Sequence, residues 1–65
     1  MTIRPIQLSE DQWEILEWHP SAGTFPLPFG MTVKTTTKDQ ANNSLMMVAE
    51  QLGSLGYYVE VEQAE

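Results

Sequence analysis

Carboxylates are the side chains in this 65-residue sequence whose number and spacing could do chemistry. Nine Asp and Glu residues stand against three Lys and Arg residues, which gives a formal net charge of −6. No Lys or Arg lies between Ser9 and Trp18 or beyond Lys38. Clustered and unneutralised acids favour a surface that binds a basic partner. Six acids lie in two such clusters: Glu10, Asp11, Glu14, Glu17, Glu60 and Glu62.

The spacing within these clusters is close to that of phosphates on a DNA strand. On a helix, Glu10 and Glu14 stand about 6 Å apart. On a strand, Glu60 and Glu62 stand about 6.6 Å apart. Successive phosphates rise about 3.4 Å and lie roughly twice that distance apart along the backbone. The six acids are therefore the candidate partner-binding residues, at positions that suit Lys and Arg sites built for phosphates. The alternative is that they only keep a small domain in solution.

Residues for catalysis or metal binding are sparse. His19 is the only histidine, there is no cysteine, and no serine lies in a nucleophile-elbow pattern. No loop has the ligand spacing of a calcium or zinc site, and no Gly-rich phosphate loop is present. We therefore expect a protein that is not an enzyme, with no catalytic residue, no metal site and no cofactor.

A long helix is predicted over Asp39–Leu55. Thr37 and Gln40 have the spacing of a capping box, with Asp39 as a competing N-cap. Gly56 suits the left-handed residue that commonly ends a helix. Apolar residues between these ends recur at steps of three and four, which gives one stripe on a helix: Ala41, Leu45, Val48, Ala49, Leu52 and Leu55.

Alternating segments on both sides of this helix predict two strands, Met31–Thr37 and Tyr57–Glu62. The two strands are expected to lie parallel and adjacent, or with another strand between them. A further strand is expected over Thr2–Leu8, at an edge of the sheet because of Pro5. The single helical stripe matches one sheet face and leaves the other face in water.

The segment Glu10–Trp18 carries signals for two structures. Ser9 and Gln12 fit a capping box, so we predict a short extra helix near the N-terminus. The rival prediction is a strand over Trp13–Trp18, because Trp and Ile favour sheets. The helix would place three of the acids within about 60° of one another on its surface: Glu10, Glu14 and Glu17.

The irregular stretch His19–Gly30 contains three prolines and two glycines. It is expected to be a connector held to the core by Phe25 and Phe29, with a partner-binding loop as the alternative. The two tryptophans, the phenylalanines, the tyrosines and the aliphatic residues are expected to supply the core. The predicted fold is a two-layer α+β single domain over residues 1–65, in which a small, mainly antiparallel sheet packs on the main helix.

The negative charge also bears on partners and location. Nucleic-acid phosphates and anionic membranes repel such a domain, so direct binding to either is not expected. No segment approaches the length of a membrane span, and the N-terminus lacks the apolar region of a signal peptide. We expect a cytoplasmic protein that is a monomer or a weak homodimer.

The whole profile resembles the small anti-CRISPR proteins of bacteriophages and mobile elements, and type I-C inhibitors in particular. The resemblance rests on size, acidity, lack of cysteine and two segments, Leu8-Ser-Glu-Asp-Gln-Trp-Glu14 and Gly56-Tyr-Tyr-Val-Glu-Val-Glu62. No shared motif allows functional residues to be transferred by position. The resemblance implies an inhibitor that acts in the bacterial host cell and binds an RNA-guided surveillance complex or its nuclease. Acidic members of such groups commonly occupy the basic path meant for target DNA.

Together with the acidic clusters, the resemblance implies a non-enzymatic inhibitor that binds a basic surface of the surveillance complex and blocks target-DNA binding, with acidic DNA mimicry as the possible mechanism. The alternative is an interaction module, either a homodimer or a subunit of a larger assembly, that uses an apolar patch. The patch would comprise Phe25, Phe29, Met46 and Met47.

Overall fold

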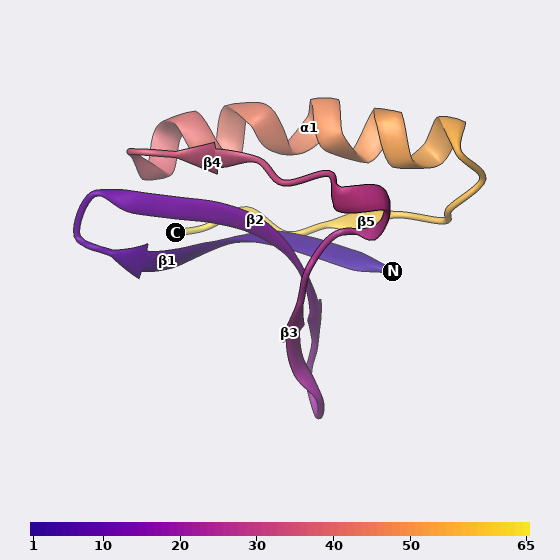
Figure 1. Cartoon of the computed structure of the whole chain (residues 1–65), viewed down its shortest axis with the longest axis horizontal. Helices are drawn as coiled ribbons and strands as arrows, with labels where there is room; N and C mark the ends of the chain where they lie inside the picture. Colours follow the sequence, from indigo (N-terminus) through magenta and orange to yellow (C-terminus); the bar gives the residue numbers. More distant parts are fainter.

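The protein is a five-stranded sheet with one long helix on one side (Figure 1). The computed structural model describes residues Met1–Glu65. Three of the four strand pairings are antiparallel, so the predicted two-layer, mainly antiparallel α+β fold is confirmed. In chain order the elements are β1 (Thr2–Ser9), β2 (Gln12–His19), β3 (Gly23–Phe25), the 3-10 turn η1 (Pro28–Gly30), β4 (Lys34–Thr35), α1 (Lys38–Ser54) and β5 (Glu60–Val61).

The ends of α1 follow the predicted signals to within one residue. Thr37 is the N-cap, and its hydroxyl oxygen accepts a hydrogen bond from the Gln40 backbone N–H at 3.1 Å. The Gln40 side-chain oxygen accepts a hydrogen bond from the Thr36 backbone N–H at 3.2 Å. In a standard capping box it would accept from the N–H of the cap residue, Thr37. Asp39 is not the cap but lies in the first turn. Its negative charge there interacts favourably with the positive end of the helix dipole.

Gly56 ends the helix in the left-handed conformation that the sequence predicts, with φ 99°. Its N–H donates to the Gly53 carbonyl at 3.0 Å, and the Tyr57 N–H donates to the Leu52 carbonyl at 3.1 Å. This pair of bonds is the Schellman arrangement, which satisfies carbonyls that a helix end leaves unpaired. The chain can therefore reverse at once and lead into β5.

The predicted helix over Glu10–Trp18 is wrong, and the rival strand is correct. Residues Gln12–His19 form β2, which pairs antiparallel with β1 along most of its length. Ser9, predicted to be a helix cap, instead pairs with Gln12 across a tight turn. A nine-residue helix gains little by itself, whereas the strand bonds to β1 on one edge and to β3 and β4 on the other. Pairing with distant residues decided between two locally acceptable structures.

The two strands that flank α1 are parallel but not adjacent. β4 is antiparallel to β2, β2 is antiparallel to β1, and β1 is parallel to β5, so β2 and β1 lie between β4 and β5. Both flanking strands are shorter than Met31–Thr37 and Tyr57–Glu62. β5 pairs only with Thr2 and Ile3 of β1, so Pro5 lies beyond the end of that pairing and removes no bond from it.

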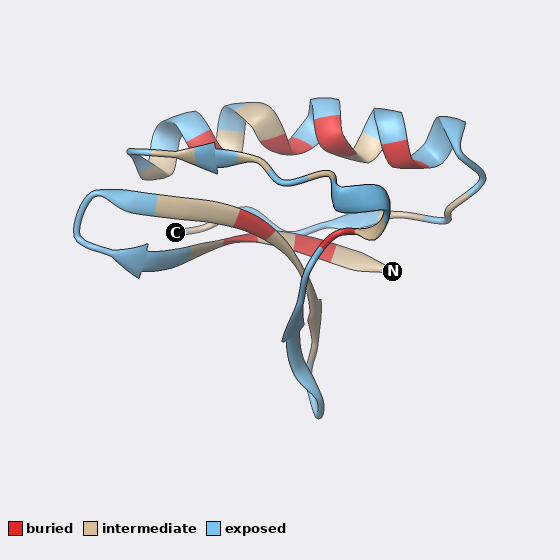
Figure 2. Ribbon diagram, in the orientation of Figure 1, coloured by how far each residue is buried: buried red, intermediate tan, exposed pale blue.

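The core lies between α1 and the sheet and consists of aliphatic side chains (Figure 2). The aromatic residues were expected to supply much of this core, but Trp13 and Trp18 are only partly buried and Phe29 is 74% exposed. Leu27, not a phenylalanine, holds the irregular stretch to the core. No helix is both long and apolar enough to span a membrane. The buried cluster comprises Ile3, Ile15, Leu27, Leu45, Val48 and Leu52.

Candidate partner-binding surface

Alternation along β1 and β2 separates the sheet into two faces. Ile3 and Ile15 are fully buried against α1, so their sequence neighbours point to the opposite side. Arg4 pairs in register with Leu16 on that side. No element of the chain covers this side in the way that α1 covers the other (Figure 1). We call it the open face; its side chains include Arg4, Ile6, Glu14, Leu16, Trp18, Lys34, Glu60 and Glu62.

Arg4 lies at the centre of the polar contacts on the open face. Its guanidinium carbon is 4.8 Å from the centre of the Trp18 ring, a cation–π arrangement. The same guanidinium is 3.7 Å from a carboxylate oxygen of Glu62. The Nε atom of Arg4 is buried without a hydrogen-bond partner. Arg4 is therefore held between β2 and the end of β5, and it partly neutralises one of the three acids on this face.

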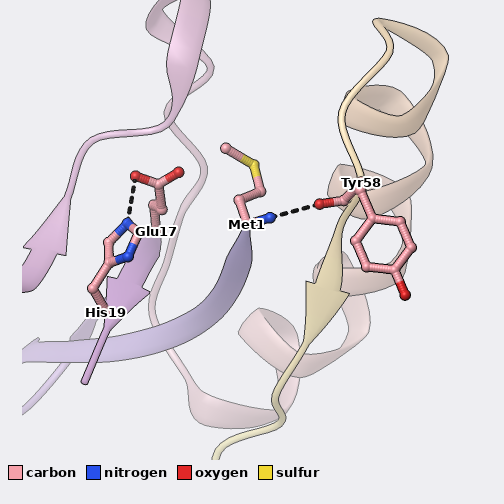
Figure 3. Close-up of polar contacts among 4 residues, drawn as sticks. All are labelled: Met1, Glu17, His19 and Tyr58. Atoms are coloured by element: carbon pink, nitrogen blue, oxygen red, sulfur yellow. Dashed lines mark hydrogen bonds and ion pairs between the residues drawn. The ribbon is translucent and has the colours of Figure 1, made fainter. Parts of the chain in front are cut away.

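Glu14 and Glu60 have no ion-pair partner, and their positions are set by strand pairing. Glu14 lies on β2 between Ile6 of β1 and Lys34 of β4. Glu60 lies on β5 beside Thr2. The Glu60 N–H donates to the Met1 carbonyl at 2.8 Å. The Met1 amino group donates to the carbonyl of Tyr58 at 2.6 Å (Figure 3). These bonds fix the β5 backbone against β1.

Glu62 shares a face with Glu60, as the predicted strand requires. Its N–H donates to the Ile3 carbonyl at 3.1 Å, one residue after β5 ends. Two residues later the chain turns toward α1, where the side chain of Asn42 both donates to the Ala64 carbonyl and accepts from its N–H. The turn opens a groove of about 570 Å³ between β1 and the last four residues.

Glu17 lies on the other side of the sheet from Glu14. They are three positions apart on a strand, so they point in opposite directions. One carboxylate oxygen of Glu17 is 3.1 Å from the Nε2 atom of His19 (Figure 3). The His19 ring meets Phe25 edge to face, with ring centres 5.4 Å apart. Glu17 is thus already paired within the β2–β3 hairpin.

The remaining two predicted site residues, Glu10 and Asp11, form the turn between β1 and β2. Both are exposed, and Asp11 accepts a hydrogen bond from the Ser9 hydroxyl at 3.3 Å. The predicted helical stripe of Glu10, Glu14 and Glu17 therefore does not form. The acids that share a face are Glu14, Glu60 and Glu62.

The alternative apolar patch is divided among separate elements. Met46 and Met47 lie on α1, away from its buried stripe, and each is 61% exposed. Phe25 lies on the β2–β3 hairpin, which projects away from α1 on the far side of the sheet (Figure 1). Phe29 packs edge to face on Tyr57, with ring centres 6.2 Å apart. The four residues do not form one surface.

Sequence reasoning missed Arg4, Leu16 and Trp18 as members of the candidate site. The signal was the alternation in Trp13–Trp18, which places Glu14, Leu16 and Trp18 on one side only if the segment is a strand. The helix prediction distributed the same residues around a cylinder and hid the relation. No three His, Asp or Glu side chains come close enough together to hold a metal ion. Comparisons of the chain with protein-family models, curated proteins and solved structures found no match.

Proposed function

We propose that this protein is a non-enzymatic inhibitor that binds a basic surface of a CRISPR RNA-guided surveillance complex and blocks target-DNA binding. The observation that carries the proposal is the gathering of Glu14, Glu60 and Glu62 on a sheet face that no other element covers. Arg4 and Lys34 are the basic residues on this face, and Lys34 lies opposite Glu14 across β2 and β4. The resemblance to small anti-CRISPR proteins supplies the class of partner, and the place of action would be the cytoplasm of the bacterial host.

The physical basis is electrostatic competition for a channel that otherwise holds DNA. Lys and Arg residues that line such a channel bind phosphates, and carboxylates on a rigid sheet can take the same positions. Each exposed pair contributes little alone, so binding is cumulative, fast and sensitive to salt. The mimicry now rests on the sheet acids and not on a helical stripe.

The test measures target-DNA binding by a purified type I-C surveillance complex, with and without this protein, at about 50 and 200 mM salt. Because DNA binding is itself sensitive to salt, binding of the protein to the complex without DNA is measured in parallel. We expect the protein to displace DNA, and we expect its binding to the complex to weaken at the higher salt concentration.

Charge reversal locates the effect on the sheet. Glu14→Lys and Glu60→Lys should each weaken inhibition and leave the protein folded, with a slightly lower thermal unfolding midpoint for Glu14→Lys because its new charge lies opposite Lys34. Glu50→Lys is the matched control, because Glu50 is exposed on α1 away from the sheet. If inhibition survives both sheet reversals in folded protein, DNA mimicry is wrong. If the wild-type protein does not bind the complex, the proposed partner is wrong.

The alternative function, an apolar interaction module, is favoured by one observation. Met46 and Met47 are adjacent and well exposed on α1, and methionine adapts readily to a partner surface. Binding through these residues would be nearly indifferent to salt. It would be lost on Met47→Ala and retained on Glu14→Lys, the reverse of the pattern expected for the acidic face.

A further inference from the structure

The open face has an apolar centre as well as acids. Ile6, Leu16 and Trp18 lie on it, and each remains partly exposed. Pro5 and Ile15, which precede Ile6 and Leu16 in the chain, are buried on the other side of the sheet. Protein interfaces that form specific complexes commonly have an apolar centre with a polar margin. The acids of the open face lie in positions that suit such a margin, with Glu14 on β2 and Glu60 and Glu62 at β5.

Trp18 is held in place before any partner arrives. The Arg4 guanidinium lies over its ring, and Glu62 in turn contacts Arg4. A side chain that is already ordered loses less conformational freedom on binding, so more of its contact energy becomes affinity. Trp and Arg are also the residue types most often found where a few side chains dominate an interface.

Charge selects the kind of partner. The open face has three carboxylates and two basic side chains, Arg4 and Lys34, a sum of −1, and the whole chain has a net charge of −6. A second copy of this chain would bring a second net charge of −6, which disfavours self-association. A protein surface with Lys and Arg around an apolar centre is the complement.

We propose that the open face docks on such a protein surface, and that Leu16 and Trp18 carry more of the affinity than the acids do. This inference rests on the proposed function and specifies how the complex is contacted. The acids set the orientation and the association rate, whereas the apolar centre sets the dissociation rate. A higher salt concentration should therefore slow association with the complex. The affinity that remains at that concentration should exceed what electrostatic contacts alone would give.

The experiment measures association and dissociation of the protein on immobilised type I-C surveillance complex at two salt concentrations. We expect Trp18→Thr to raise Kd about 30-fold and Leu16→Thr about 10-fold, mainly through faster dissociation at both salts. Threonine keeps the strand propensity of these positions. Val61→Thr is the matched control and should bind like the wild type, because Val61 is 38% exposed on the other side of the sheet, in register with Ile3.

Thermal unfolding of each variant separates loss of the surface from loss of the fold. Trp18 also packs on Arg4, so Leu16→Thr alone decides the matter if Trp18→Thr does not fold. Equal binding by wild type and folded Leu16→Thr overturns the inference and leaves the proposed function standing. If the wild-type protein does not bind the complex, both fall. A wild-type dimer in sedimentation equilibrium that becomes monomeric on Leu16→Thr would replace the partner with a second copy.

Discussion

The two faces of the sheet are built from alternate residues of the same two strands, yet they differ in almost every property. The face under α1 presents Ile3 and Ile15, which are fully buried and carry no polar contact. The open face presents Arg4 and Leu16, their neighbours in the chain, among acids and a tryptophan. The covered face specifies the fold through close packing. The side chains of the open face are not buried in the core, so they are available to contact a partner.

The largest expected difference between the faces is in stability. Ile15→Ala should lower the free energy of unfolding by about 2–5 kcal/mol, because it removes buried methyl groups and leaves a cavity under α1. Leu16→Ala, one residue along, should cost about 1 kcal/mol, because its side chain is already partly in water. Urea denaturation followed by circular dichroism measures both. Equal losses would mean that the two faces contribute alike to the core.

Two glycines near the C-terminal end of α1 should respond oppositely to alanine substitution: one change should lower the stability of the protein and the other should raise it. Gly56→Ala should destabilise the protein by about 1 kcal/mol, since alanine rarely adopts a φ of 99°. Gly53→Ala, inside α1 with open space around its Cα, should stabilise it by up to about 1 kcal/mol. Thermal unfolding of the two variants checks the pair. A neutral Gly56→Ala would show that the helix end does not depend on the left-handed residue.

The smallest effect concerns the open face itself. A double-mutant cycle with Arg4→Met and Trp18→Leu should give a coupling energy of about 0.5–1 kcal/mol in urea denaturation, the usual size of a partly exposed cation–π contact. The coupling should change little with salt, because the ring attracts the guanidinium over a short distance. Zero coupling would mean that Arg4 does not order Trp18 before a partner binds.

The sequence predicted α1 well because its signals are local. Thr37, Gln40 and Gly56 act within four residues of the helix ends, and the apolar stripe fits only one period. The sequence misled over Gln12–His19 because the same residues satisfy a helix cap and a strand, and the deciding bonds come from β1 on one edge and β3 and β4 on the other. Local pattern cannot weigh bonds to residues that are distant in the chain.

The wrong helix prediction also made part of the predicted site wrong. Glu60 and Glu62 were placed correctly on one face, since their strand was recognised. Glu14 was grouped with Glu17, although a strand separates them onto opposite sides, where Glu17 pairs with His19. The division of acids between faces is thus a property of the tertiary pairing and not of the acidic cluster.

The pairing of β1 with β5 has a consequence for how the chain folds during synthesis. On one edge of β1, Thr2 and Ile3 pair with Glu60 and Val61, near the opposite end of the chain. On the other edge, Ile3 pairs with Glu17 of β2. A ribosome holds the most recent residues inside its exit tunnel, so the first strand emerges long before the strand that completes its edge. Until then β1 has an unpaired edge that other chains could occupy. The hairpin of β1 and β2 can form early, but the sheet closes only after translation has delivered β5, and this long-range step should limit the folding rate.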